Sequence, residues 1–185
     1  LNISHFKVTG LDNWGWKIEK AIEIIEEARS RGQDISADFY PYCGGSTTLL
    51  SLLPPDCMGD TLEETIDRLG TAAGKEQLRR EIYRENRGWD NIVRAIGWKR
   101  IMISTVISKE NDSLAGSDFM SAAAGIGDQE TVDIMAELLC QEKGKVGIIV
   151  MSMSQEDVDR VAKLPYTMLI SDALYGAGDC PHPRL

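Results

Sequence analysis

The sequence lacks several features that would assign it to a class of protein at once. It has no run of 18 apolar residues, so nothing in it predicts a membrane-spanning helix. Its four cysteines, Cys43, Cys57, Cys140 and Cys180, have none of the paired spacings typical of zinc ribbons or redox sites. We therefore expect reduced thiols and no disulfide framework. No internal repeat or low-complexity tract is visible.

Positive charge is also scarce. The 185 residues include 20 Lys and Arg against 29 Asp and Glu, for a net charge of −9, and the cations are interspersed with acids. A nucleic-acid surface needs a cationic stripe, which this pattern does not offer. With 43% hydrophobic residues the chain can bury a core. We expect a soluble, cytoplasmic globular protein with neither nucleic acid nor a membrane as a partner.

The two ends of the chain share a pattern of alternating strands and helices. After a short apolar strand at the start, 3.6-residue spacing predicts a helix from about Trp14 to Arg31, and Ile35–Tyr42 alternates as a strand. Near the end, Val146–Met153 is apolar on both faces, as in a buried parallel strand. A helix over Ser154–Leu164 and a strand over Thr167–Ser171 follow. These four strands predict an α/β fold, part of a (β/α)8 barrel.

The middle of the chain lacks this regular alternation. An extended segment is predicted at Arg100–Ser108, but no second sheet can be counted. We predict barrel segments at 1–53 and 146–185 and a mainly helical insertion or small subdomain at 54–145. The helices expected in this insertion cover Thr61–Leu69, Lys75–Asn86 and Gly127–Glu142, with a possible helical turn at Trp89–Gly97.

Residues with chemical potential follow the predicted strands. In an extended strand His5 and Lys7 point to the same face, which suits a metal ligand beside an anion anchor. The alternative is a surface histidine on a strand edge. Asp172 follows the apolar run Met168–Ile170, where a carboxylate can bind metal and exchange protons with bound water. The alternative is that it caps the next turn.

Five short motifs occur in an order that resembles a known family. Together they resemble the D-aminoacylases (N-acyl-D-amino-acid deacylases) of the amidohydrolase superfamily, over nearly the whole chain except the segment between Pro55 and Asp112. The motifs are Ile3–Lys7 with Val8 and Gly10, Asp38–Tyr42 followed by Gly45–Thr47, Met153–Val158, Ile170–Asp172, and His182–Leu185.

The resemblance implies a zinc-dependent (β/α)8 hydrolase that cleaves the amide of an N-acyl-D-amino acid. His5 resembles a zinc-ligating histidine of a barrel strand. Asp172 resembles the last-strand aspartate, a metal ligand that takes a proton from metal-bound water and delivers it to the leaving amine. The positions that resemble those holding the substrate carboxylate are Lys7, Tyr40, Ser46 and Arg184. Those that resemble the pocket for the substrate side chain are Val150 and Met153.

The chain departs from the family pattern at two positions and lacks others. Phe6 stands where the family usually has a second histidine, and Ala173 where it has glycine. The resemblance implies that the other metal ligands precede Leu1, so we expect a piece of a longer polypeptide that holds no closed zinc site alone, is inactive alone, and self-associates through open sheet edges. The alternative function is a non-catalytic, barrel-derived binding or assembly protein.

Overall fold

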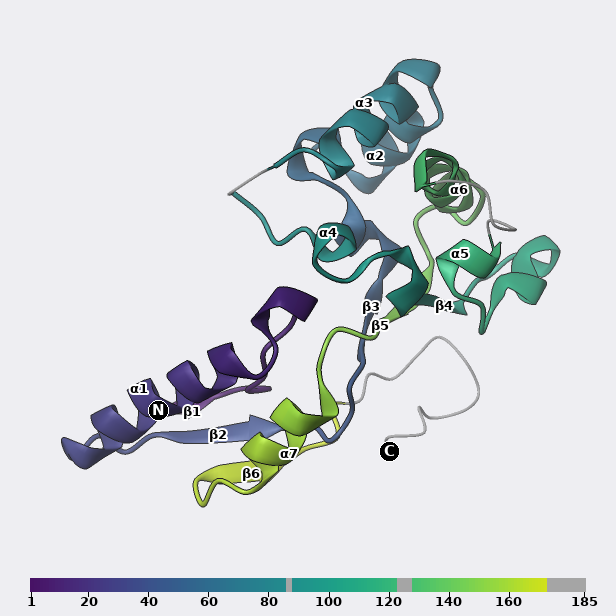
Figure 1. The fold of residues 1–185 in the computed structure, drawn as a ribbon. Helices are drawn as coiled ribbons and strands as arrows, with labels where there is room; N and C mark the ends of the chain where they lie inside the picture. The colour runs from purple at the N-terminus through teal and green to yellow at the C-terminus, as the bar shows by residue number, and fades with distance from the viewer. Residues whose placement is uncertain (86–87, 123–127, 173–185) are drawn as a thin grey trace. The chain divides into compact units, whose positions relative to one another are not determined.

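The computed structural model describes residues 1–85, 88–122 and 128–172 (Figure 1). The chain forms two compact units. One combines residues 1–43 with the segment that begins at Met153, and the other is residues 44–152. The two units divide at 43/44 and 152/153, about ten residues before and seven after the boundaries at 53/54 and 145/146 that we predict for the barrel segments. Within the described ranges, no helix is both long enough and apolar enough to cross a membrane.

The first unit is built on a parallel sheet of three strands in the order β1-β2-β6. Ala37 of the central strand lies opposite Ile3 on one side and Thr167 on the other. The parallel β-α-β connection that the sequence predicts at the start of the chain is confirmed. The one predicted near the end is wrong, because β5, the strand before α7, belongs to the other sheet and only β6 pairs parallel with β2. The elements are β1 (Asn2–Ile3), α1 (Trp16–Ser30), β2 (Ser36–Phe39), α7 (Gln155–Ala162) and β6 (Thr167–Leu169), with a 3-10 turn at Leu11–Asn13.

Helices α1 and α7 lie beside this sheet (Figure 1). The predicted apolar stripe of α1 is buried at Ile18, Ile22, Ile25 and Ala28, and it packs in one cluster with residues of β2 and α7. Ser154 caps α7 as predicted, because its hydroxyl accepts a hydrogen bond from the Asp157 amide at 3.1 Å. These two helices fix the sheet from one side.

The second unit contains a sheet that the sequence analysis missed. Strands β3, β5 and β4 pair antiparallel in that order, with β5 in the centre. The interpretation of Val146–Met153 as a parallel barrel strand is therefore wrong, although its strand character is correct. The elements are β3 (Gly45–Thr48), α2 (Leu62–Leu69), α3 (Ala72–Ile82), α4 (Ile92–Ile96), β4 (Ile101–Thr105), α5 (Phe119–Ala122), α6 (Asp128–Gln141) and β5 (Gly147–Val150), with 3-10 turns at Leu49–Leu52, Pro55–Cys57, Trp98–Arg100 and Lys109–Leu114.

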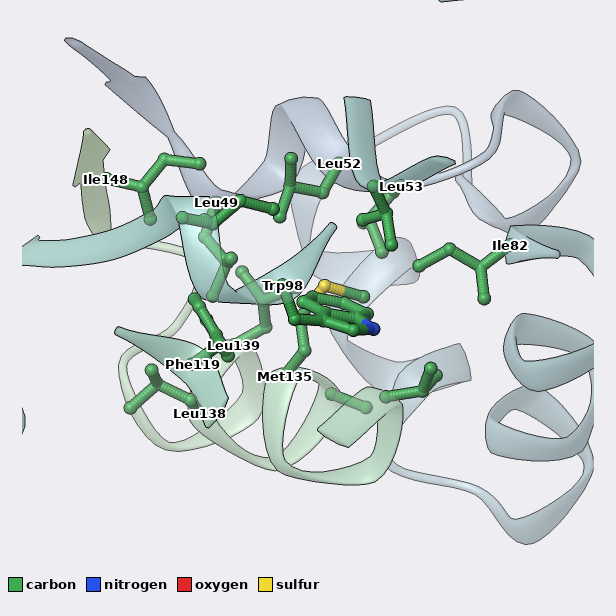
Figure 2. Close-up of a cluster of buried hydrophobic side chains, with 14 of the residues drawn as sticks. Leu49, Leu52, Leu53, Ile82, Trp98, Phe119, Met135, Leu138, Leu139 and Ile148 are labelled. Atoms are coloured by element: carbon green, nitrogen blue, oxygen red, sulfur yellow. The ribbon is translucent and has the colours of Figure 1, made fainter. Parts of the chain in front are cut away.

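A large apolar core holds this unit together (Figure 2). The Trp98 and Phe119 rings lie 5.5 Å apart between centroids, and Met135 and Leu139 of α6 are fully buried in the same cluster. The Trp98 indole donates a hydrogen bond to the Tyr83 hydroxyl at 2.8 Å, so its buried N–H is satisfied. The core therefore joins β-strands and helices that are far apart in sequence.

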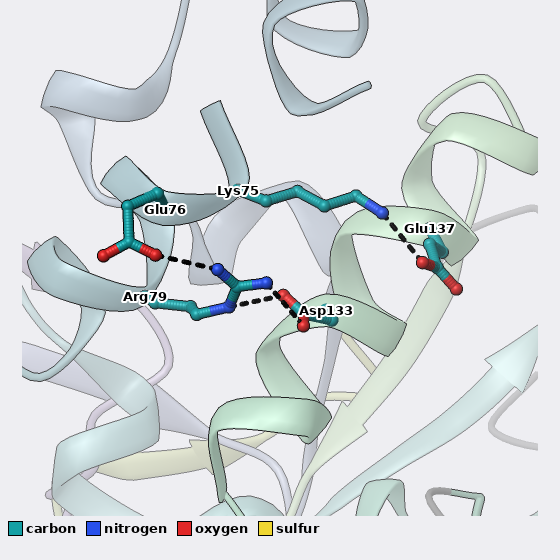
Figure 3. Close-up of polar contacts among 5 residues, drawn as sticks. All are labelled: Lys75, Glu76, Arg79, Asp133 and Glu137. Carbon is teal, nitrogen blue, oxygen red and sulfur yellow. Dashed lines mark hydrogen bonds and ion pairs between the residues drawn. The ribbon is translucent and has the colours of Figure 1, made fainter. Parts of the chain in front are cut away.

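Ion pairs link α3 to α6 across the surface of the second unit (Figure 3). The Arg79 guanidinium contacts both carboxylate oxygens of Asp133, at 2.8 and 2.7 Å, and also reaches Glu76. Lys75 pairs with Glu137 at 2.7 Å. A two-pronged Arg–carboxylate contact fixes orientation as well as distance, so it sets how the two helices face each other.

Candidate active site

The segment that carries His5 and Lys7 is a turn, not a continuing strand. Strand β1 ends at Ile3, and His5 has a φ of +41° in the left-handed region. The prediction that His5 and Lys7 share one face of an extended strand is therefore wrong. Residues other than glycine seldom adopt this conformation, although histidine does so more often than most of them. The turn leaves the His5 side chain exposed.

Asp38 provides the physical reason for this turn. Its side chain is buried on β2, and its carboxylate accepts a hydrogen bond from the His5 amide at 2.6 Å. The side-chain amide of Asn2 donates to this carboxylate at 2.7 Å, and the Ser4 hydroxyl donates to it at 3.3 Å. The His5 hydrogen bond lowers the pKa of Asp38 most strongly; burial opposes it, and Asn2 and Ser4 add to the lowering. Asp38 is thus an ionised anchor for the turn.

Lys7 lies against an aromatic ring. Its ammonium is 5.0 Å from the centroid of the Tyr40 ring and donates a hydrogen bond to the His5 carbonyl at 3.1 Å. Burial lowers the pKa of Lys7, while the negative charges of Asp172 and Asp38 act in the opposite direction. A half-buried ammonium held in this way is suited to binding a carboxylate.

A pocket of the first unit brings four of the predicted site residues together. His5, Lys7, Tyr40 and Met153 all line it, with apolar side chains including Val158. Tyr40, Met153 and Val158 are buried and form a small hydrophobic cluster. The pocket therefore joins an imidazole and an ammonium to an apolar wall, which is the combination expected of a site for a small anion with a hydrophobic part.

Asp157, a second buried aspartate, also lines this pocket. Its carboxylate accepts a hydrogen bond from the Gly15 amide, at 3.1 and 3.2 Å to its two oxygens. This contact ties the start of α1 to α7. Sequence reasoning missed both aspartates as parts of the site. The signal available for Asp38 was that it is the one charged residue of the predicted strand Ile35–Tyr42.

Asp172 comes three residues after the end of β6 and is exposed. The Ile170 amide donates to the Phe39 carbonyl at 2.8 Å, which extends the pairing of β6 with β2 toward it. Asp172 has a φ of +46°, so it also adopts the left-handed conformation. Because its charge acts on Lys7, it belongs to the same electrostatic environment as the pocket residues.

The remaining predicted residues lie elsewhere. Ser46 is exposed on β3, and Val150 is buried on the neighbouring strand β5, where it joins the core of the second unit. The first unit therefore holds the pocket, and the second holds these two residues. Arg184 lies outside the described residues.

Two of the predicted site residues carry groups that can bind zinc. No group of three or more His, Cys, Asp and Glu side chains suited to a metal ion occurs within 1–85, 88–122 and 128–172. His5 and Asp172 supply an imidazole and a carboxylate, both normal zinc donors, and both are exposed. A catalytic zinc takes three protein ligands, so two donors alone do not make such a site.

Comparisons with known proteins agree with the motifs. No protein-family model matches the sequence. A curated D-aminoacylase of Alcaligenes xylosoxydans xylosoxydans is 30% identical over 183 residues, which are 99% of this chain and 27% of that protein. A crystal structure of D-aminoacylase, described as defining a novel subset of amidohydrolases, matches with a TM-score of 0.57 at 28% identity. A D-aminoacylase structure from work on its binuclear metal center matches with a TM-score of 0.55 at 27% identity.

This chain covers only a part of each of these proteins. Both structural matches include 99% of this chain but 28% of the other chain. The chain thus spans little more than a quarter of the length of these relatives. Along nearly its whole length, it is similar to the D-aminoacylases of the amidohydrolase family.

Proposed function

We propose that the full-length protein containing this chain is a zinc-dependent amidohydrolase that converts N-acyl-D-amino acids to a carboxylate and a free D-amino acid. The observation that carries the proposal is the pocket in which His5, Lys7, Tyr40 and Met153 meet. Similarity to D-aminoacylase over 99% of the chain supports the substrate class. In this proposal the β1-β2-β6 sheet is an arc of a (β/α)8 barrel.

Each pocket residue has a role that its chemistry supports. Lys7 binds the substrate carboxylate through its ammonium, with the Tyr40 ring keeping that ammonium in place. Met153 and the buried face of Tyr40 contact the apolar part of the substrate. In the same proposal, Ser46 and Arg184 add contacts to the carboxylate, and Val150 belongs to the side-chain pocket.

His5 and Asp172 hold the metal in this proposal, together with ligands outside the described residues. Bound zinc would lower the pKa of a water toward neutrality. Asp172 would accept the proton of the water that adds to the acyl carbon, and would deliver it to the amine nitrogen that leaves when the C–N bond breaks. The exposed carboxylate of Asp172 is accessible to a metal ion and to substrate.

An Asp172→Asn variant of the full-length protein tests this assignment. The amide keeps the shape of the side chain but cannot accept the proton, so kcat should fall by at least ~10²-fold. Asp34→Asn is the matched control, since Asp34 is also an exposed aspartate of the first unit but does not line the pocket. Activity of Asp172→Asn within a few-fold of the wild type would show that Asp172 merely caps a turn.

A further inference from the structure

Asp38 is buried beneath the active-site turn, and both of its carboxylate oxygens accept hydrogen bonds. One oxygen accepts from the His5 amide, the other from Asn2, and the Ser4 hydroxyl lies 3.3 and 3.4 Å from the two. A buried carboxylate in such a network has little capacity left for a further ligand. Its location therefore suits a group that holds other residues in place rather than one that binds metal itself.

The same turn carries His5 and Lys7, two residues that line the pocket. The Phe6 amide also donates to the Asp38 backbone carbonyl, at 2.7 Å, so β2 holds His5 and Phe6 from below. The His5 carbonyl in turn accepts the Lys7 ammonium at 3.1 Å, and that ammonium lies over the Tyr40 ring. Asp38 thus holds the backbone of His5, and the carbonyl of the same residue accepts the Lys7 ammonium.

We propose that Asp38 is a positioning residue that holds His5 and Lys7 in the geometry needed for metal and substrate binding. The proposal rests on the proposed function. A left-handed residue persists only where its surroundings fix it, and the hydrogen bond from the His5 amide to Asp38 is the contact that does so here. Groups that orient a metal ligand commonly alter metal affinity about 10–100-fold when removed.

Two substitutions in the full-length protein test this. Asp38→Ala removes every acceptor of the network, and zinc affinity, measured by competition with a chelator, should fall about 10–100-fold. The KM for an N-acyl-D-amino acid should rise as well, since Lys7 loses its support. Asp38→Asn keeps one oxygen for the His5 amide but turns an NH2 toward Asn2, so it should lie between Asp38→Ala and the wild type in both measurements.

Glu142→Ala is the control for lost stability. Glu142 is an equally buried carboxylate that accepts backbone hydrogen bonds from Ile107 and Ser108, but it belongs to the second unit and does not line the pocket. Its loss should lower the melting temperature and leave zinc affinity within two-fold of the wild type. If Asp38→Ala does not fold, Asp38→Asn decides in the same way.

The outcomes separate the two proposals. Wild-type full-length protein that binds no zinc would overturn the proposed function. Wild-type protein that binds zinc, together with Asp38 variants of unchanged affinity and KM, would overturn only the positioning role. An equal loss of zinc affinity in Glu142→Ala would do the same, because it would show a general effect of stability.

Discussion

The Lys7 ammonium is held by two contacts, with the Tyr40 ring and with the His5 carbonyl. Lys7→Met keeps most of the length of the unbranched side chain but removes the charge, and with it the ammonium contact with the Tyr40 ring. A lost charged hydrogen bond costs about 1.5–3 kcal/mol, so the KM for an N-acyl-D-amino acid should rise by roughly 10–100-fold while kcat changes less.

A neutral substrate provides the control for this prediction. An N-acyl-D-amino acid amide has no carboxylate, so Lys7→Met should alter its KM far less than that of the acid. Lys17→Met, which removes an exposed lysine of α1, should change neither KM. An equal effect of Lys7→Met on acid and amide would contradict the role of Lys7 as a carboxylate anchor.

At the scale of elements, Glu142 attaches the end of α6 to the loop after β4. Its carboxylate accepts hydrogen bonds from the Ile107 and Ser108 amides at 2.6 and 3.0 Å, from the Ser108 hydroxyl, and from Asn111 at 2.7 Å. Burial raises the pKa of Glu142, but these hydrogen bonds lower it more, to about 2 against an ordinary value of 4.5. The folded state therefore keeps this carboxylate ionised in acid.

This shift predicts a pH dependence of stability. Above pH 4.5 the contribution of Glu142 is fully present, and it is lost as the pH falls from 4.5 to about 2, because the unfolded chain takes up the proton first. Glu142→Gln should be less stable than the wild type at pH 7, and the difference should shrink toward pH 2. Urea unfolding of both proteins at pH 7, 4.5 and 3 measures the difference between their free energies of unfolding. A difference that stays constant over this range would contradict the lowered pKa of Glu142.

Elements that depend on local signals could be predicted from the sequence. The stripe Ile18, Ile22, Ile25 and Ala28 specifies α1, and the Ser154 hydroxyl specifies the start of α7. The second sheet could not be predicted, because both strands that pair with β5 are far from it in the sequence. The apolar run of β5 also fits the centre of a parallel sheet as well as that of an antiparallel one. β3, with the sequence Gly-Ser-Thr-Thr, has no apolar alternation to reveal it.

The candidate site shows the same division between local and distant signals. The residue types at His5, Lys7 and Asp172 were visible in the sequence, and the resemblance gave them roles. The turn at His5 was not visible, because a carboxylate on β2, 33 residues away, determines it. A strand pattern alone therefore placed His5 and Lys7 on the wrong backbone geometry.

At the scale of the whole molecule, the sheet of the first unit predicts association. Among the residues that the structure describes, strands β1 and β6 are the edges of the order β1-β2-β6, and Leu1, Met168 and Leu169 are 81%, 53% and 66% exposed. Unpaired edges with apolar side chains recruit other chains. The isolated 185-residue chain should form dimers or larger species at tens of micromolar in gel filtration with light scattering. A clean monomer would show that the edges are covered.

An enantiomer-resolved deacylation assay tests whether the full-length protein hydrolyses N-acyl-D-amino acids with the help of zinc. The purified protein would be given matched N-acetyl-D- and N-acetyl-L-amino acids, with zinc present and after removal by a chelator. We predict release of the free amino acid from D substrates in preference to L, loss of this activity without metal, and its return when zinc is added. No deacylation of any D substrate by folded, zinc-loaded protein would contradict the account and favour a non-catalytic binding protein.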